Sequence, residues 1–304
     1  MEYRQLGSLS VSVVGIGCNN FGGRIDEPAA HAVVHAALDA GINFFDTADI
    51  YGGTKSEEYL GRALGTRRHD VLIATKFGHR IDDQRHGAHP DYIRQAVDAS
   101  LRRLGAEVID LYQIHTPDVT VPIADTLGAL DDLVKAGKVR EIGCSNFTVE
   151  MLREAEAAVK PGEAGFASVQ NHYSLIHFEP ELPVIDECAR ANIKFLPYFP
   201  LANGLLTGKY RRGEPVTSGR LANSPRKDQL LVAENFDKVE QLTAYAEQRG
   251  HTILELAFGW LLWHQVIPSV IAGATKPEQV HANAAASTWA LTDDEVIEIN
   301  AIMA

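Results

Sequence analysis

The segment VVGIGCNNFGG, residues 13–23, distinguishes between the two folds that alternating strands and helices can build. It begins as a short apolar strand and continues into a turn rich in glycine and asparagine. A doubly wound open sheet that binds a dinucleotide carries the spacing G-x-G-x-x-G at this turn. The glycines here stand at positions 15, 17, 22 and 23 and do not match that spacing. The segment therefore favours the alternative, a closed barrel of strand–helix units.

Seven later segments share the character of this first strand. Each is short, rich in β-branched and aromatic residues, and apolar on both alternating faces, which is typical of parallel strands covered on both sides. Helical patterns lie between them. The expected strands are VVGIGC, NFFDTA, VLIATKF, VIDLYQIH, VREIGCSN, FASVQNHY, KFLPYFP and VIPSVIAGA. Eight such units in roughly 250 residues predict a single (β/α)8 barrel domain over residues 1–304.

Further segments are predicted around this repeat. Residues 2–14 should form a small hairpin before the barrel, and residues 292–303 an additional amphipathic C-terminal helix. The link from about 202 to 236 is too rich in Gly, Arg, Asn and Ser for a plain helix, and long links of this kind are usually lids or binding loops. Helix starts are predicted by capping-box patterns at Thr54–Glu57, Thr275–Glu278 and Thr292–Glu295.

Composition excludes several classes of protein. A net charge of -12 gives no electrostatic attraction to nucleic acid or anionic lipid. The N-terminal residues lack the features of a secretory signal, and no apolar run is long enough to span a bilayer, so we expect a cytoplasmic protein. The three cysteines, Cys18, Cys144 and Cys188, are too few and too scattered for a disulfide framework or a zinc site. We expect them to be reduced and buried, and we expect no metal.

Titratable side chains stand at the ends of three neighbouring strands. The second strand ends at Asp46 with Tyr51 just beyond it, the third at Lys76 and the fourth at His115. The carboxyl ends of barrel strands meet at one rim, where such enzymes place their catalytic groups. Any one of these residues alone is more often structural, and Asp49 is interpreted as a turn residue. Four together indicate a reactive site.

These residues resemble those of the aldo-keto reductase superfamily, with similarity to the branch that includes potassium-channel β subunits. The block FDTADIYG…SEEYLG and the ordered set of four carry the resemblance, which runs from YRQLG to PEQVHANAAA. It implies that Tyr51 is the general acid, that Lys76 lowers its pKa, that Asp46 holds Lys76, and that His115 orients the substrate carbonyl. Hydride addition builds negative charge on oxygen, and a free tyrosine with a pKa of about 10 is too weak an acid to neutralise it.

The resemblance also implies a nicotinamide cofactor, NADPH in preference to NADH. Ser145, Asn146 and Gln170 would hold the carboxamide, and Tyr198 would stack on the ring. A basic excess in the long link suggests an anionic ligand, and small residues before a helix N-terminus suit the adenosine 2′-phosphate. The remaining cofactor candidates are Phe199, Pro200, Leu201, Gly204, Leu205, Lys209, Arg220, Gly273, Ala274, Thr275, Lys276, Gln279 and Asn283.

The expected activity is the NADPH-dependent reduction of an aldehyde or ketone, with a small carbonyl compound as the substrate and no prediction of the oligomeric state. Candidate substrate walls are Asn20, Phe21, Ile50, Phe77 and Tyr173, with His79, His86 and His89 on the rim. Two alternatives come from other classes. A redox-sensing regulatory subunit would bind the nicotinamide with little turnover. A metal-dependent barrel hydrolase lacks a convincing ligand set.

Overall fold

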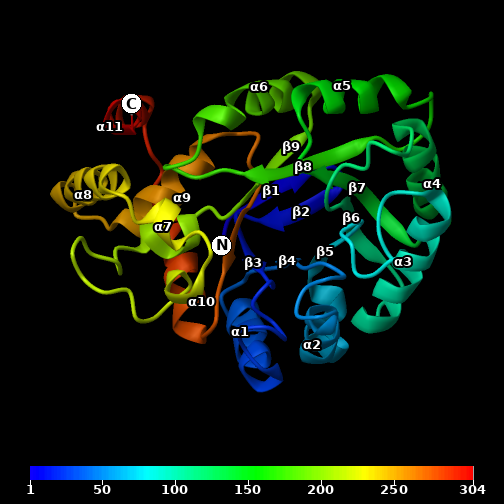
Figure 1. The fold of residues 1–304 in the computed structure, drawn as a ribbon, viewed down its shortest axis with the longest axis horizontal. Helices are drawn as coiled ribbons and strands as arrows, with labels where there is room; N and C mark the ends of the chain where they lie inside the picture. The colour runs from blue at the N-terminus through cyan, green and yellow to red at the C-terminus, as the bar shows by residue number, and fades with distance from the viewer. Residues whose placement is uncertain (304) are drawn as a thin grey trace.

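Eight parallel strands form one curved sheet within residues 1–303, the part of the chain that the computed structural model describes (Figure 1). Their hydrogen-bonded order is β10-β3-β4-β5-β6-β7-β8-β9. The end strands β9 and β10 lie side by side, and Phe195 N–H of β9 donates to the carbonyl of Val266, which precedes β10, at 2.8 Å. The predicted barrel is confirmed. Its strands are β3 (Val14–Gly17), β4 (Phe44–Asp46), β5 (Leu72–Phe77), β6 (Ile109–Ile114), β7 (Val139–Ser145), β8 (Phe166–His172), β9 (Lys194–Tyr198) and β10 (Val270–Gly273).

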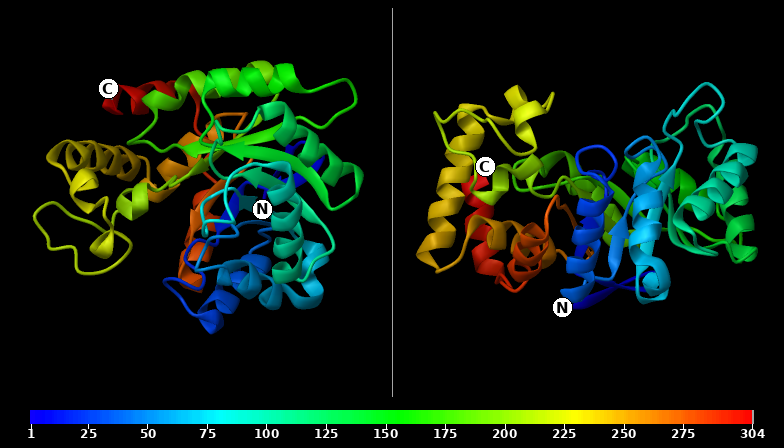
Figure 2. Two further views of the ribbon diagram at one scale, coloured as in Figure 1. Left: turned by 45° about the vertical axis from the view of Figure 1, so that its right-hand side comes forward. Right: turned by 90° about the horizontal axis from the view of Figure 1, so that it is seen from below.

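Helices surround this sheet, and the helices between its strands bury apolar side chains in the core (Figure 2). In Pro90–Leu104, for example, Ile93, Val97 and Leu104 face inward with almost no exposed surface, as their helical spacing predicts. The described helices are α1 (Glu27–Asp39), α2 (Lys55–Leu64), α3 (Pro90–Leu104), α4 (Ile123–Lys135), α5 (Val149–Ala158), α6 (Leu182–Ala191), α7 (Lys227–Leu230), α8 (Ala233–Gln248), α9 (Ile253–Trp263), α10 (Pro277–Ala286) and α11 (Asp293–Met303). None of them is both long and apolar enough to cross a membrane.

The predicted N-terminal hairpin consists of β1 (Tyr3–Leu6) and β2 (Leu9–Ser12), paired antiparallel. Its apolar side chains, including Leu6 and Leu9, join residues of the barrel interior in a second core cluster. The hairpin thus covers the barrel interior at the end opposite the strands' C-termini, and any site at the C-terminal rim opens on one side only. Helix α11 matches the additional C-terminal helix expected at 292–303.

Two of the three predicted helix starts need correction. Thr292 and Glu295 exchange the reciprocal bonds of a capping box, as predicted. Thr54 precedes α2 but has a left-handed backbone (φ 78°), and its side chain makes no capping bond. Thr275 bonds to Gln279 instead of Glu278, because α10 begins at Pro277 and its first turn is shifted by one residue. The capping-box pattern alone does not determine whether a helix begins one residue later.

The link at 202–236 contains three short helical turns and ends inside α8. The turns are η3 (Ala202–Thr207), η4 (Leu221–Asn223) and α7. The yellow-green and yellow part of the link leaves the barrel and returns beside the N-terminal segments (Figure 1). Arg220 donates to Asn19 Oδ1 at 3.2 Å, so the link contacts the loop after β3. This contact places the link across the C-terminal face of the barrel.

Glycine-to-alanine variants at two helical positions should have opposite effects on stability. A Cβ at Gly61 in α2 would lie 2.4 Å from the Leu104 carbonyl oxygen of α3, so Gly61→Ala should separate the helices and reduce the free energy of unfolding by about 1–3 kcal/mol. A Cβ at Gly128 in α4 would have no neighbour within 4 Å, and Gly128→Ala should add about 0.5–1 kcal/mol. Urea denaturation of both variants measures the difference. Equal midpoints would contradict the close packing of α2 on α3.

Candidate active site

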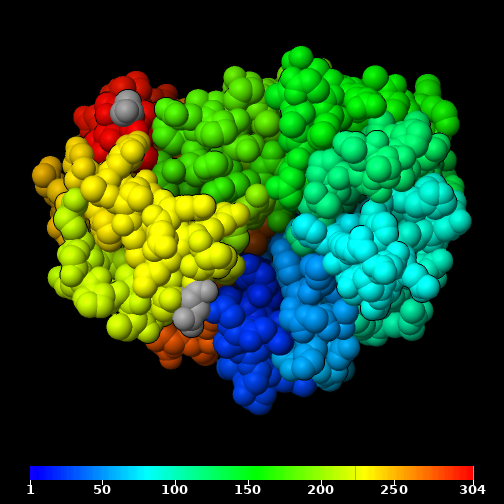
Figure 3. All heavy atoms as spheres, viewed as in Figure 1, coloured from blue at the N-terminus to red at the C-terminus, as the bar shows by residue number. Residues whose placement is uncertain are grey.

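A cavity of about 430 Å³ opens at the C-terminal rim of the barrel. Figure 3 shows a hollow where the yellow link meets the blue N-terminal and the green segments. Residues from the ends of β3, β4, β6, β7, β8, β9 and β10 line it, together with the link. Among the predicted catalytic residues, Asp46, Tyr51 and His115 line the cavity directly. Lys76 lies beneath its floor with no exposed surface.

Asp46 and Lys76 form a buried ion pair at the centre of the rim. Lys76 Nζ donates to Asp46 Oδ2 at 2.6 Å and to the Thr47 carbonyl at 2.9 Å. The other oxygen of Asp46 accepts from Gln113 at 3.3 Å and from Gln170 at 2.9 Å. Burial of a charge is costly unless it is paired and hydrogen-bonded, and here both oxygens of the carboxylate have donors. The pair therefore fixes the ammonium group beside the cavity.

Tyr51 lies next to this ammonium group, with Lys76 Nζ at 5.2 Å from its ring centroid. Burial raises the pKa of Tyr51, while the Lys76 charge lowers it and Asp46 raises it again. The net direction is upward, which is opposite to the expectation that Lys76 brings the pKa of Tyr51 below its usual value. The chain keeps Tyr51 as a protonated phenol beside a fixed cation.

His115 is held as a neutral ring against Tyr51. The two ring centroids are 5.6 Å apart at 81°, and His79 packs on the other side at 4.3 Å. Burial, then the charges of Lys76 and His79, lower the pKa of His115 to about 2. Its Nδ1 is buried and has no hydrogen-bond partner among the described residues, which suits an unprotonated nitrogen. The other ring nitrogen is then available as a hydrogen-bond donor.

The predicted carboxamide and ring residues gather on the next three strands. Ser145 Oγ donates to the Gln170 carbonyl at 2.6 Å, and Asn146 Nδ2 donates to Ser145 Oγ at 3.2 Å. Tyr198 OH donates to Asn146 Oδ1 at 2.9 Å, which ties the aromatic ring to this amide group. His172 stacks on Tyr198, with the two ring centroids 5.4 Å apart and an interplanar angle of 8°. Polar amides and a flat aromatic face thus line one wall of the cavity.

Most of the other predicted cofactor residues also line the cavity. They are Phe199, Pro200, Leu201, Gly204, Lys209, Arg220, Gly273, Thr275, Gln279 and Asn283. Leu205 and Ala274 are buried in the core instead, and Lys276 is exposed at the N-terminus of α10. Asn283 Nδ2 is buried without a partner in the described structure, so one donor is free on the cavity wall.

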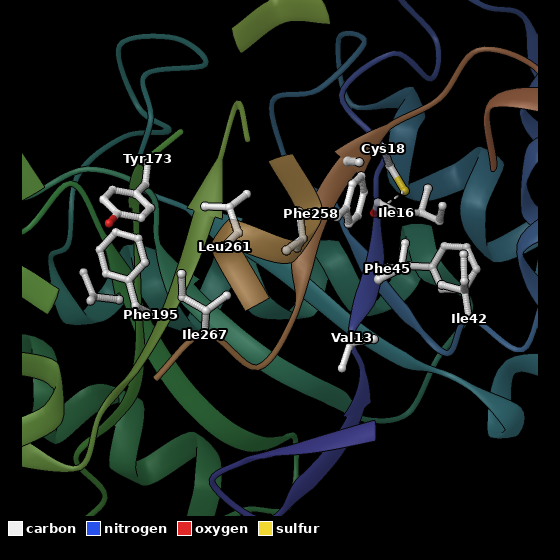
Figure 4. Close-up of a cluster of buried hydrophobic side chains, with 14 of the residues drawn as sticks. Val13, Ile16, Cys18, Ile42, Phe45, Tyr173, Phe195, Phe258, Leu261 and Ile267 are labelled. Carbon is white, nitrogen blue, oxygen red and sulfur yellow. Dashed lines mark hydrogen bonds between the residues drawn. The ribbon is translucent and has the colours of Figure 1, made fainter. Parts of the chain in front are cut away.

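The predicted substrate walls divide into two groups. Asn20 lines the cavity, whereas Phe21, Phe77 and Tyr173 are fully buried in the core and do not line it. Figure 4 shows Tyr173 packed beside Phe195, and its ring stacks on Trp260 at 5.1 Å. Phe77 stacks on Tyr112 at 4.8 Å, because it points away from the side of β5 that carries Lys76. Ile50 is half-buried outside the lining.

Two of the rim histidines lie away from the cavity. His79 lines it, but His86 and His89 are on the surrounding loop, where His89 caps α3. Among the described residues no group of three or more His, Cys, Asp and Glu side chains is placed to hold a metal. The three cysteines are free and buried.

Other lining and supporting residues were not predicted. Gln113 bonds to Asp46, and its position two residues before His115 on one strand places both on the same face, so alternation could have identified it. Arg24 and Arg226 line the cavity from loops, where no periodic pattern indicates direction. Their position depends on the path of the link.

An eight-stranded barrel with a lysine–aspartate pair, a tyrosine and a neutral histidine at its C-terminal rim defines a class, the barrel oxidoreductases that act on carbonyl or alcohol groups. The sequence profile of the Aldo/keto reductase family matches residues 13–304. The chain belongs to this family.

Known members of the family align with nearly the whole chain. The aldo-keto reductase yakc of Schizosaccharomyces pombe, designated NADP(+), is 34% identical over 97% of this chain and 89% of its own length. The aldo-keto reductase YhdN of Bacillus subtilis is 33% identical over 100% of this chain and 94% of its own length. The glycerol dehydrogenase AKR11B4 from Gluconobacter oxydans has a similar structure, with a TM-score of 0.87 at 31% identity over 99% of this chain and 95% of that one.

Proposed function

We propose that the protein reduces an aldehyde or ketone to an alcohol with NADPH, and that Tyr51 delivers the proton. The observation that carries the proposal is the fixed ammonium of Lys76, which lies beside a protonated Tyr51 at the floor of the cavity. Negative charge develops on the carbonyl oxygen as the bond to hydrogen forms, and a nearby cation and proton donor both stabilise it. Asp46 keeps the ammonium in place.

The residues of the cavity fit a nicotinamide dinucleotide. The wall made by Ser145, Asn146 and Tyr198 offers amide groups and an aromatic face to a carboxamide-bearing ring. At the other end, the unpartnered Nδ2 of Asn283 offers a donor to a base. NADPH, when bound, would supply the hydride.

The chain's own groups would move the proton and orient the carbonyl. Tyr51 OH would give its proton to the carbonyl oxygen, and the Lys76 ammonium would stabilise the tyrosinate that remains. Neutral His115 would donate a hydrogen bond from Nε2 to the same oxygen. Solvent would then return a proton to Tyr51 through the open side of the cavity.

NADPH is favoured over NADH by charge near the adenosine end. Lys276 precedes α10, whose N-terminus attracts anions, and its exposed side chain adds a positive charge at that helix end. Removal of the Lys276 charge would reduce the preference for NADPH over NADH.

The test is the oxidation of NADPH by purified protein with 4-nitrobenzaldehyde, repeated with NADH. Turnover with NADPH and a higher Michaelis constant for NADH would support the proposal. Tight NADPH binding without turnover across a wide panel of aldehydes and ketones would contradict it and support the regulatory-subunit alternative.

The rate of reduction should depend little on pH across the neutral range. A raised pKa keeps the proton on Tyr51 to higher pH, and a pKa of about 2 keeps His115 neutral to lower pH. We therefore expect kcat to change less than about twofold from about pH 5 to pH 8, with no inflection near the ordinary histidine pKa of about 6.5. Steady-state rates in constant ionic strength buffers measure the profile. An inflection near 6.5 would show that a histidine titrates in the catalytic step.

A further inference from the structure

Four cations line the cavity of the candidate active site. Arg24, Lys209, Arg220 and Arg226 form no ion pair with a carboxylate among the described residues. The cavity lining contains one carboxylate, Asp46, which is paired with Lys76. The cavity is therefore positively charged in a protein whose net charge is -12. Unpaired cations of this kind are sites for anions.

Three of the cations gather around the turn η3, which contains the predicted cofactor residues Gly204 and Leu205. A Cβ on Gly204 would lie 2.7 Å from Lys209 Nζ, so this amine touches the turn. Burial and the charges of Arg24 and Arg220 lower the pKa of Lys209, which shows that all three lie close together. Two phosphate groups can neutralise this group of cations.

Arg226 lies apart from Lys209, at the ring end of the cavity. Its guanidinium carbon is 4.8 Å from the ring centroid of Phe199, and Arg220 stacks on the same ring at 5.0 Å. Its charge helps to lower the pKa of His172 and His177, beside Tyr198. Arg226 therefore lies near the wall where the carbonyl would be reduced.

Neither the histidines nor the nearby acid neutralises Arg226. The pKa of His79, His115, His172 and His177 is lowered in each case, so all four are neutral at pH 7 and add no charge of their own. Burial raises the pKa of Tyr198 and the charge of Glu181 adds to this, but Glu181 does not line the cavity. The charge of Arg226 is left for a ligand.

We propose that the carbonyl substrate carries an anionic group of the carboxylate type, and that Arg226 binds this group. This inference rests on the proposed reductase function and specifies its substrate class. The guanidinium lies over the face of Phe199, and among the described residues no carboxylate pairs with it, so its N–H groups can form two parallel bonds to a substrate carboxylate. A neutral aldehyde would still be reduced, but without this contact.

The test uses two aldehydes of the same shape that differ in charge, 4-carboxybenzaldehyde and 4-nitrobenzaldehyde, at saturating NADPH. Arg226→Gln should raise KM for the carboxylate compound about tenfold, the scale of one charge-assisted hydrogen bond, and change KM for the nitro compound less than about twofold. Arg226→Lys should recover part of the loss. Higher salt should raise only the carboxylate compound's KM.

Arg211→Gln is the matched control, because Arg211 lies on the same link but is exposed and outside the cavity lining. It removes the same charge from the protein and should leave both KM values unchanged. The affinity for NADPH is measured for each variant by fluorescence.

The outcomes separate the two proposals. If neither aldehyde is reduced by the wild type, the proposed function fails. If the nitro compound is reduced and Arg226→Gln affects both aldehydes equally or neither, the substrate inference is overturned. A tenfold loss of NADPH affinity in Arg226→Gln would also overturn it, since Arg226 would then belong to the cofactor site.

Discussion

Tyr51→Phe should reduce kcat for aldehyde reduction by about 10²- to 10⁴-fold, the contribution of a positioned general acid. The change removes one oxygen atom and leaves the ring beside Lys76 and His115 in place. Without the phenol, the proposed mechanism has lost its general acid. Steady-state NADPH oxidation with 4-nitrobenzaldehyde measures the loss.

Cofactor binding distinguishes a chemical defect from a structural one. Tyr51→Phe should bind NADPH within about twofold of the wild type, because the predicted cofactor contacts come from other strands. Tyr112→Phe provides a matched control, since Tyr112 is a buried tyrosine whose OH has no partner and does not face the cavity. Its kcat should stay near the wild-type value. A Tyr51→Phe protein with unchanged turnover would remove Tyr51 from the mechanism.

Lys76→Met should lower the free energy of unfolding by about 3–5 kcal/mol, because it leaves the Asp46 carboxylate buried without its cation. Gln113 and Gln170 would still donate to the other carboxylate oxygen but bring no charge. Turnover should fall together with stability. Urea denaturation gives the free energy, and residual activity is measured well below the unfolding midpoint.

The double variant Asp46→Asn with Lys76→Met separates the two effects. It removes both charges, so it should recover most of the lost stability. It should not recover activity, because the ammonium beside Tyr51 is still missing. A double variant as unstable as Lys76→Met would mean that shape, and not charge, accounts for the loss.

The sequence was sufficient for the barrel because each strand is apolar on both faces. Burial on both sides gives a short continuous apolar run, and the eight runs appear in the order that the sheet requires. Helix starts were less certain. Thr54 and Thr275 fit a local pattern, yet the backbone around each is set by tertiary contacts.

Within the site, strand ends were predictable and side-chain environment was not. Asp46, Lys76 and His115 could be placed because parallel strands end at one rim. Phe77 and Tyr173 were assigned to the cavity by their position in the sequence, but they point to the helices. The direction of the shift in the Tyr51 pKa depends on the balance between burial, which raises the pKa, and the Lys76 charge, which lowers it. Only the packed structure shows this balance. Arg226 could not be assigned to the cavity from the sequence, because its position depends on the path of a long link.

The open junction between β9 and β10 has a consequence for the dynamics of the barrel. Tyr198 ends β9, Gly273 ends β10, and both line the cavity. These strands are the two ends of the hydrogen-bonded order, so ladder bonds do not hold them together in residues 1–303. A molecule bound across both strand ends would supply the missing connection. Part of its binding free energy would then stabilise this junction, and occupancy would couple to local unfolding there.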